Sequence, residues 1–587
     1  MGKEAPGPSQ GAEPVQLGFG GFVAQLSMMF AVLRASSGRA GLMWLDIGLI
    51  GVIAATAYWQ IELNAWNKPF YDALSRRDLA DFLSQLGVFG EIAGALLVLN
   101  VAQTWLNQML RMRMREAFTR DLFVEWLAPR RIFLLSQAGE IGVNPDQRIH
   151  EDARHLADLT TDLGVGLLQA ALLLACFIGV LWGLSSGVVL SFAGRHLVIP
   201  GYMVWCALIY AGIASAASGF VGRPLIGLNA EHYARESDLR FSLVHLNEHG
   251  EDVALYGGEA TELARLDRVL GRLLFILRRL VGATTRLAWV TAGYGWFTIV
   301  APIIVAAPAY FDGNLTFGGL LMSAGAFTQV QQSLRWFIDN ASALADWRAT
   351  LHRVAAFRAA LLKTDGAEPG PSRIAVEVSA DDRLRIEDLE VFLPYATITL
   401  SKSVVELAPG ERVLIVGAPG AGKTSLFRAL AGLWPWGSGS IALPRDGAVM
   451  FMPKRPYFPE GSLREALAYP APPEKFSQQA YEVALARLGL GRLLPDLDRT
   501  SRWDQELNDP EQQTLAFARL RLHEPRWVVI DEALEAVGPE TREAVFDLLA
   551  KELSRTAVLC IGGPQARRDR RAKVLALNFE PLEPNLA

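Results

Sequence analysis

Cysteine is scarce in this chain: its 587 residues include only Cys176, Cys206 and Cys560, which lie far apart. They form no CxxC pair and have no metal-binding spacing, so they indicate neither a disulfide scaffold nor a zinc site. Charged residues are also few, at 20%, whereas 51% of the residues are hydrophobic. This balance is too apolar for an ordinary soluble enzyme and for a disordered chain.

An excess of positive charge is missing as well. The chain has 56 Lys and Arg against 61 Asp and Glu, a net charge of -5, so nothing indicates a nucleic-acid partner. Its length exceeds the roughly 100–200 residues of one domain. These features together indicate a multi-domain membrane protein that carries a large soluble part.

Hydrophobic stretches close to the roughly 20 residues that cross a bilayer recur in the first part of the chain. We expect a disordered tail at 1–15 and a helical membrane domain at 16–363 that begins with an interfacial helix at 16–34. Six spans are predicted, at about 42–60, 84–106, 160–184, 197–220, 287–310 and 317–338.

Basic residues in the loops predict the orientation of these spans. Eight arginines lie between the second and third spans and nine between the fourth and fifth, whereas the alternate loops hold four basic residues. The two long loops, both termini and the soluble half are therefore expected in the cytoplasm. Because the long loops have a helical pattern, the spanning helices are expected to extend well beyond the membrane.

Acidic residues at membrane depth are costly and are functional candidates by default. Glu91 lies within the second predicted span. Two interpretations stay open for it: a cavity-lining or proton-linked role, or a satisfied internal pair. Glu62, Asp162 and Asp339 lie near span ends, where headgroups or water explain them.

The composition changes near residue 365, where a Pro/Gly-rich linker (364–380) leads to a second domain at 381–587. An apolar strand, Val413–Val416, runs into a glycine-rich loop and then a helical pattern, which is the context of a phosphate-binding P-loop. Lys423 is expected to reach the β- and γ-phosphates, and Thr424 to offer a hydroxyl to Mg²⁺. The nucleotide-binding residues are predicted to be Gly417, Ala418, Pro419, Gly420, Ala421, Gly422, Lys423, Thr424 and Ser425.

A second apolar strand, Trp527–Ile530, ends in Asp531 and Glu532. An aspartate in this position suits Mg²⁺ binding together with Thr424, and Glu532 is then placed to orient or deprotonate the attacking water. The two carboxylates and the P-loop predict an ATP site that uses Mg²⁺.

Six spans joined to such a domain resemble an ABC transporter with its membrane and ATPase domains on one chain. The segments WNKPFYDALSRRD (66–78), NPDQRIHED (144–152), EDVALYGGE (251–259), AGLWPWGSG (431–439) and EQQTLAFARLRLHEPRW (511–527) resemble the SbmA/BacA-like bacterial relatives of the peroxisomal acyl-CoA branch. The resemblance implies an exporter-like six-helix membrane domain followed by an α/β P-loop ATPase domain. It also implies a dimer in the bacterial inner membrane, because each ATP is held between one P-loop and the partner's signature.

The signature departs from the family pattern. Where the family has LSGGE or a close variant, this chain has Leu507–Glu511. Asn508 can still donate a hydrogen bond, but Asp509 brings a negative charge toward the phosphates and Pro510 has no N–H to donate. These changes oppose ATP hydrolysis more than ATP binding.

Three further family positions differ. The Q-loop glutamine is replaced by Lys454, the D-loop aspartate by Gly538 and the switch histidine by Gly563. An ammonium cannot ligate Mg²⁺, although it can supply positive charge beside the phosphates. Phe392 and Tyr395 are the two candidates for the aromatic residue that stacks on adenine, and either one could equally be core packing.

The sequence thus favours an ATPase-coupled translocase with altered catalytic motifs that imports peptides or other large hydrophilic solutes, as a homodimer or with a paralogous half-transporter. Three alternatives stay open. The chain could be a proton-coupled transporter with a relic nucleotide domain, the degenerate half of a heterodimer, or an acyl-CoA or lipid transporter.

Overall fold

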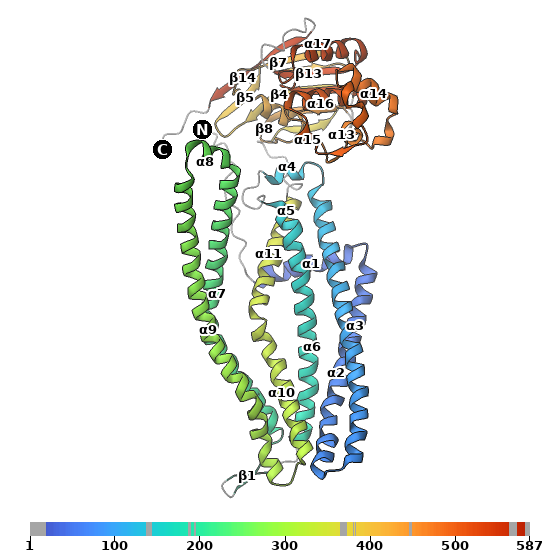
Figure 1. The fold of residues 1–587 in the computed structure, drawn as a ribbon. Helices are drawn as coiled ribbons and strands as arrows, with labels where there is room; N and C mark the ends of the chain where they lie inside the picture. Colours follow the sequence, from blue (N-terminus) through green and yellow to red (C-terminus); the bar gives the residue numbers. More distant parts are fainter. Residues whose placement is uncertain are drawn as a thin grey trace. The chain divides into compact units, whose positions relative to one another are not determined.

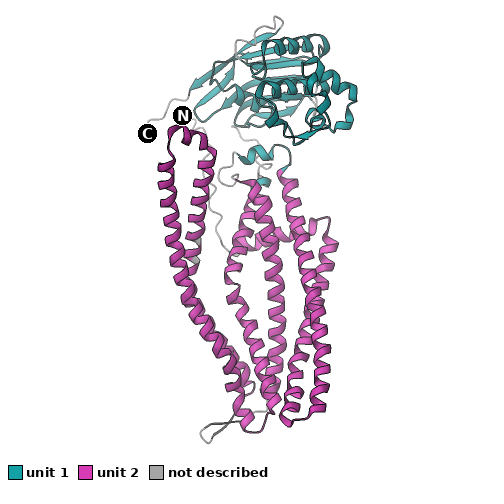
Figure 2. Ribbon diagram, viewed as in Figure 1, with its two compact units in different colours: residues 1–13, 127–142, 360–587 teal, residues 14–126, 143–359 magenta. Residues whose placement is uncertain are grey.

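The computed structural model describes residues 19–136, 144–185, 189–192, 195–363, 373–379, 381, 383–444, 449–562 and 572–581. The predicted tail and most of the predicted linker lie outside these residues. The chain divides into two compact units (Figure 2). Residues 14–126 and 143–359 form the membrane unit, and residues 127–142 and 360–587 form the nucleotide unit.

The membrane unit is helical, apart from the hairpin β1 (Val189–Phe192) and β2 (Arg195–Val198) that joins two of its helices. Its helices are α1 (Phe19–Ala35), α2 (Arg39–Arg76), α3 (Leu79–Trp126), α5 (Pro145–Gln147), η2 (Arg148–Asp152), α6 (Ala153–Ser185), α7 (Tyr202–Glu248), α8 (Gly250–Tyr256), α9 (Glu259–Phe311), α10 (Phe317–Asp339) and α11 (Ala341–Lys363).

Five helical segments of the described chain are long and apolar enough to cross a membrane: α2, α3, α5 to α6, α7 and α9. They contain the first, second, third and fifth predicted spans and most of the fourth, and they extend beyond them, as expected. With 47 and 53 residues, α7 and α9 are about 70 and 80 Å long, against roughly 30 Å of hydrocarbon core.

Two details of the predicted spans differ in the structure. The fourth span begins at Tyr202 instead of residue 197, because residues 195–198 pair as a strand with β1. The sixth predicted span forms α10, which has 23 residues and is not among the five apolar segments. Glutamines 329, 331 and 332 lower its hydropathy, and it packs against α2, α6, α7 and α9.

Helices α7 and α9 pack on each other as a long hairpin closed by α8, and toward α8 this hairpin leaves the other helices of its unit (Figure 1). Large aromatic side chains along it are exposed within the described part of the chain. Those exposed by 70–89% include Phe220, Tyr233, Phe241, Tyr256 and Trp289.

The nucleotide unit is built on a ten-stranded sheet, counted over the described residues. Strands β14, β7, β13, β12 and β9 are neighbours in that order and run parallel, while the other strands form a mainly antiparallel part joined through β14 and β5. The ten strands are β3 (Ala375–Val378), β4 (Leu384–Phe392), β5 (Ala396–Leu400), β6 (Val404–Leu407), β7 (Arg412–Val416), β8 (Gly437–Leu443), β9 (Val449–Met452), β12 (Trp527–Asp531), β13 (Ala557–Gly562) and β14 (Lys573–Pro581).

The parallel strands are the buried centre of this unit. Every residue of β12 and β13 is buried, as expected for strands covered on both faces. The unit also contains the short pair β10 (Gly461–Ser462) and β11 (Thr500–Ser501). Its helices are α4 (Arg131–Ser136), α12 (Lys423–Leu430), α13 (Leu463–Ala468), η3 (Pro473–Lys475), α14 (Gln478–Arg487), η4 (Gly491–Asp496), α15 (Trp503–Glu506), α16 (Asp509–His523), α17 (Pro539–Asp547) and η5 (Leu548–Glu552).

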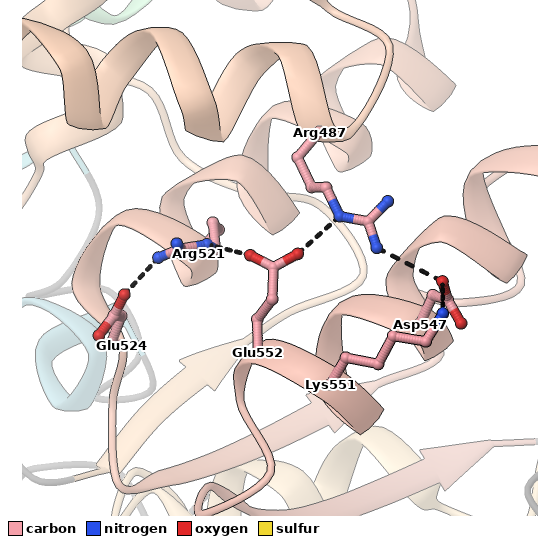
Figure 3. Close-up of polar contacts among 6 residues, drawn as sticks. All are labelled: Arg487, Arg521, Glu524, Asp547, Lys551 and Glu552. Atoms are coloured by element: carbon pink, nitrogen blue, oxygen red, sulfur yellow. Dashed lines mark hydrogen bonds and ion pairs between the residues drawn. The ribbon is translucent and has the colours of Figure 1, made fainter.

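An ion-pair network joins the ends of four helical elements (Figure 3). The carboxylate of Glu552, at the end of η5, accepts from Arg487 at the end of α14 and from Arg521 in the last turn of α16, both at 2.7 Å. Arg487 also reaches Asp547 of α17 at 3.5 Å. Burial by itself raises the pKa of the Glu552 carboxyl, but the two arginines outweigh it and the pKa lies below its usual value.

Helix α4 belongs to the nucleotide unit, although it lies in the first long loop of the predicted membrane domain. The guanidinium of Arg428, on the helix that follows the P-loop, lies 5.6 Å from the ring centre of Phe133 on α4. Gly432 follows α12, and a Cβ there would lie 2.8 Å from the guanidinium carbon of Arg130. Within the nucleotide unit, α4 and Arg130 thus lie against the helix that follows the phosphate loop.

Candidate functional site

The loop between β7 and α12 has the geometry expected of a phosphate-binding loop. Gly420 and Gly422 have φ of +81° and +80°, the left-handed region that glycine adopts without strain. A Cβ on Gly422 would lie only 2.1 Å from Cδ1 of Ile398, so this position requires glycine. Because the first N–H groups of α12 are unpaired and lie at the positive end of the helix dipole, the loop is suited to phosphate.

The remaining predicted loop residues are part of the same turn. Residues 417–422 connect the strand to the helix, and Lys423, Thr424 and Ser425 form the first turn of α12. The site begins at the carboxyl edge of the parallel strands, where ligands of open α/β sheets bind.

Lys423 and Glu532 contact each other directly. The Lys423 ammonium is buried, lies 2.9 Å from Oε1 of Glu532 and donates to the carbonyl of Gly417 at 3.2 Å. Lys454 approaches the other carboxylate oxygen of Glu532 at 3.1 Å, and its side chain is 64% exposed. The hydrogen bond from Lys423 is the largest influence on the pKa of Glu532, which is lowered despite burial, and Lys454 lowers it further. Glu532 is therefore held as a carboxylate between two ammonium groups.

Asp531 ends the buried strand β12 and is 1% exposed. Burial raises the pKa of its carboxyl, and this outweighs the opposing hydrogen bond from Thr424. Its Oδ1 is buried and has no hydrogen-bond partner among the described residues. An unpartnered carboxylate oxygen beside a threonine hydroxyl matches the oxygen ligands that Mg²⁺ prefers, so the residues present fit this ion.

The segment predicted to be an altered signature, Leu507–Glu511, lies at the start of α16. Asn508 is the N-cap: its Oδ1 accepts from the backbone N–H of Glu511 at 3.0 Å, while the Glu511 carboxylate accepts from the N–H of Asn508 at 3.1 Å. Asp509 and Pro510 occupy the first two helical positions and are exposed. Proline is tolerated there because that N–H has no partner within the helix. Asp509 and Pro510 therefore suit the start of this helix, where Pro510 offers no N–H donor and Asp509 adds a negative charge.

Two buried polar residues that the sequence reasoning missed support the site. Gln513 on α16 is 1% exposed and donates to the carbonyls of Pro453, at 3.2 Å, and of Lys454. Arg519 on the same helix donates to the carbonyl of Tyr457 at 3.1 Å, and burial lowers its pKa to about 10. A glutamine and an arginine on the mainly apolar buried face of this helix are the signal that could have identified them.

The other candidate positions lie as follows. Gly538 is the N-cap of α17 with an ordinary φ of -63° and contributes no side-chain cap. Gly563 lies outside the described residues. Phe392 is half-buried at the end of β4, whereas Tyr395 is 61% exposed, with its ring centre 6.4 Å from that of Phe579. Tyr395 is thus the more accessible of the two aromatic candidates.

Glu91 lies on α3, remote in sequence from the nucleotide site, and is exposed. Within the described part of the chain it has no ion-pair or hydrogen-bond partner. The satisfied internal pair that the sequence left open is therefore absent from these residues.

Comparisons with known proteins agree with this architecture. The family model described as ABC transporter transmembrane region 2 matches residues 35–311, and the model described as ABC transporter matches residues 400–535. The chain is 29% identical over 520 residues to the inner membrane ABC transporter ATP-binding protein YddA of Escherichia coli strain K12, covering 88% of this chain and 91% of that protein.

A human protein and a solved structure extend the likeness. The lysosomal cobalamin transporter ABCD4 of Homo sapiens is 25% identical, with 98% of each chain covered. The structure of a bacterial Atm1-family ABC exporter with ATP bound matches with a TM-score of 0.68 and 16% identity, over 92% of this chain and 94% of that one. This match confirms the fold class expected from the sequence.

Proposed function

Because the chain belongs to the ABC transporters that join a transmembrane region and an ATP-binding domain, we propose that it is an SbmA/BacA-like importer of peptides or other large hydrophilic solutes in the bacterial inner membrane. In this proposal the chain binds ATP with Mg²⁺ but hydrolyses it weakly. The observation that carries it is an intact phosphate loop and carboxylate pair in the same domain as a changed signature.

Nucleotide binding follows from the groups around the loop. The N–H groups of the glycine-rich turn and of the α12 N-terminus receive the phosphates. Lys423, which pairs with Glu532 at 2.9 Å, moves its charge to the β- and γ-phosphates. Asp531 and Thr424 would hold Mg²⁺, which supplies charge neutralisation for the leaving phosphate.

Weak hydrolysis follows from Glu532 and the signature. Glu532 orients the attacking water. Lys454, whose ammonium lies 3.1 Å from this carboxylate, still neutralises its charge after Lys423 has moved to the phosphates. A carboxylate stabilised in this way is a poorer base. In a two-domain sandwich, the partner's Asp509 approaches the phosphates with a negative charge, and that repulsion opposes closure of the site.

The exposed aromatic surface of the α7–α9 hairpin supports a dimer. The exposed aromatic residues of the α7–α9 hairpin lie on helices that leave the rest of their unit. Large exposed apolar surfaces mark interaction sites or membrane contact. A second copy would cover the part of the hairpin beyond the membrane, and its signature would complete the nucleotide site of the first copy.

The solute class and location rest on family likeness. The E. coli relative is named an inner membrane protein, and the human relative is named a cobalamin transporter. Cobalamin is a large polar molecule, which is consistent with a cavity for large hydrophilic solutes. Substrate does not follow from fold, so an acyl-CoA or lipid substrate is the alternative for this cavity.

Two alternatives concern energy coupling. Glu91 is exposed and unpaired in the described chain, which suits a proton carrier in a proton-coupled transporter whose nucleotide domain is a relic. The changed signature and the retained Glu532 are also compatible with one half of a heterodimer. In that case the partner chain supplies a signature of the usual family sequence.

Uptake in cells that lack the endogenous protein tests the proposal. Wild type, Lys423→Ala, Glu532→Gln and Glu91→Gln are compared with labelled peptides and cobalamin, with and without a protonophore. The proposal expects uptake to fall in Lys423→Ala and to survive Glu91→Gln. Uptake that survives Lys423→Ala but collapses with the protonophore and in Glu91→Gln would establish proton coupling instead.

A further inference from the structure

Two histidines and a glutamate meet where α7 ends. His245 lies in the last turn of α7, Glu248 is its final residue and His249 is the residue that caps it. One ligand atom from each of the three lies within 4.8 Å of the others, and all three side chains are exposed. Histidines four residues apart lie on one face of a helix, which is the spacing of helical zinc-binding pairs.

The second histidine is already oriented for a metal. Nδ1 of His249 lies 2.9 Å from the backbone carbonyl of His245. Because a carbonyl only accepts, Nδ1 carries the proton and Nε2 of the neutral ring keeps the free electron pair. This type of hydrogen bond fixes ring orientation in metal sites. The ring of His245 is supported by Phe241, with ring centres 6.2 Å apart and planes 6° from parallel.

The surroundings favour a cation. The last carbonyls of α7 lie at the negative end of the helix dipole. Glu251 and Asp252 follow in the first turn of α8. The site thus has negative potential without a large desolvation cost, because its ligands are exposed.

The donor set selects the metal. Two imidazoles and one carboxylate, with a water in the fourth position, form a common ligand set of Zn²⁺. Mg²⁺ and Ca²⁺ prefer oxygen ligands alone. Zinc bonds to nitrogen and oxygen are about 2.0–2.2 Å long, so the three donor atoms, which lie within 4.8 Å of one another, must reach bonding distance of one shared ion. Rotation of exposed side chains achieves this at small cost.

We propose that His245, Glu248 and His249 form a binding site for Zn²⁺ at the cytoplasmic end of α7. The cysteine pattern gives no indication of it, since the site contains no cysteine. Bound zinc would stiffen the corner between α7 and α8, because His249 both ends α7 and precedes α8. The proposal is independent of the nucleotide chemistry.

Zinc binding to the full-length protein tests this inference. The protein is purified without a polyhistidine tag, in lipid nanodiscs, with excess Mg²⁺ and no nucleotide. Zn²⁺ is titrated against a chromophoric chelator for wild type, His245→Ala, His249→Ala and Glu248→Gln. Wild type is expected to bind one Zn²⁺ per chain, and loss of either histidine is expected to weaken binding at least about tenfold.

A matched control lies on the same helix. His232 approaches Glu236 at 3.7 Å and offers only two donors, so His232→Ala is expected to leave zinc affinity unchanged. X-ray absorption at the zinc edge supplies a second readout, in which two imidazole ligands are expected and are lost in the double histidine variant. Equal zinc affinity in wild type and that double variant, or no zinc binding by wild type, would overturn the proposal.

Discussion

Replacing Asp509 by Asn separates what this residue does for its helix from what it does to the nucleotide. In the folded domain Asp509 is the first residue of α16 and is exposed. A carboxylate there stabilises the helix by about 0.3–1 kcal/mol through the dipole. Asp509→Asn is therefore expected to lower the free energy of unfolding of the nucleotide domain slightly.

The same change is expected to strengthen ATP binding in the closed dimer. Unit charges about 6 Å apart at an effective dielectric constant of about 60 repel by about 1 kcal/mol, so a doubly charged phosphate gains about 1–2 kcal/mol. That corresponds to a gain of roughly 5- to 30-fold in ATP affinity. Stability and affinity thus change in opposite directions, which a general loss of folding cannot produce.

Thermal unfolding without nucleotide and ATP binding in nanodiscs measure the two effects. Asp498→Asn is the matched control, since it removes one carboxylate from the same domain, is 81% exposed and lies outside α16. This control is expected to leave ATP affinity unchanged. If Asp509→Asn lowers stability and leaves both ATP affinity and hydrolysis at the wild-type level, the charge argument for the signature is wrong.

Three further predictions follow from single contacts. Glu552→Gln is expected to lower the free energy of unfolding by about 1 kcal/mol at pH 7. Because the folded-state pKa of Glu552 is lowered, its contribution is present above the unfolded pKa near 4.3 and is lost as pH falls through the folded value. The free energies of unfolding in urea of wild type and Glu552→Gln should therefore converge at low pH. Gln513→Leu is expected to lower the free energy of unfolding by about 1 kcal/mol and to speed hydrogen exchange around Lys454, because the carbonyls of Pro453 and Lys454 lose their buried donor. Unchanged exchange there would contradict this anchoring. Gly422→Ala is expected to abolish ATP binding while the domain stays folded, because the new Cβ is strained at φ +80° and would lie 2.1 Å from Ile398; normal affinity would refute the requirement for glycine.

Elements with a strong local pattern were predictable from the sequence. The strand into the P-loop, the buried strand that ends at Asp531 and the long helices of the membrane unit all have a regular apolar pattern that one segment reveals by itself. The beginning of the fourth span was predicted five residues early, because the strands β1 and β2 between α6 and α7 are as apolar as the end of a helix. In α10, the buried Gln331 and its neighbouring glutamines lower the hydropathy on which span prediction depends.

Contacts between distant segments were not predictable in this way. Helix α4 packs on the helix after the P-loop through Phe133 and Arg428, which are nearly 300 residues apart in sequence. The two lysines that hold Glu532 and the anchoring of the Lys454 loop by Gln513 are likewise products of tertiary folding. The sequence places a lysine at position 454, where the family resemblance predicts a glutamine, but only the structure brings that charge to Glu532.

The central claim, that an intact phosphate site works with a signature that opposes hydrolysis, is tested most directly by ATP binding and steady-state hydrolysis of the purified protein in lipid. Wild type, Lys423→Ala and Glu532→Gln are compared. We expect wild type to bind ATP with Mg²⁺ and to hydrolyse it slowly, with binding lost in Lys423→Ala and the residual hydrolysis lost in Glu532→Gln. Rapid hydrolysis by wild type, or equal ATP binding by Lys423→Ala, would contradict this account.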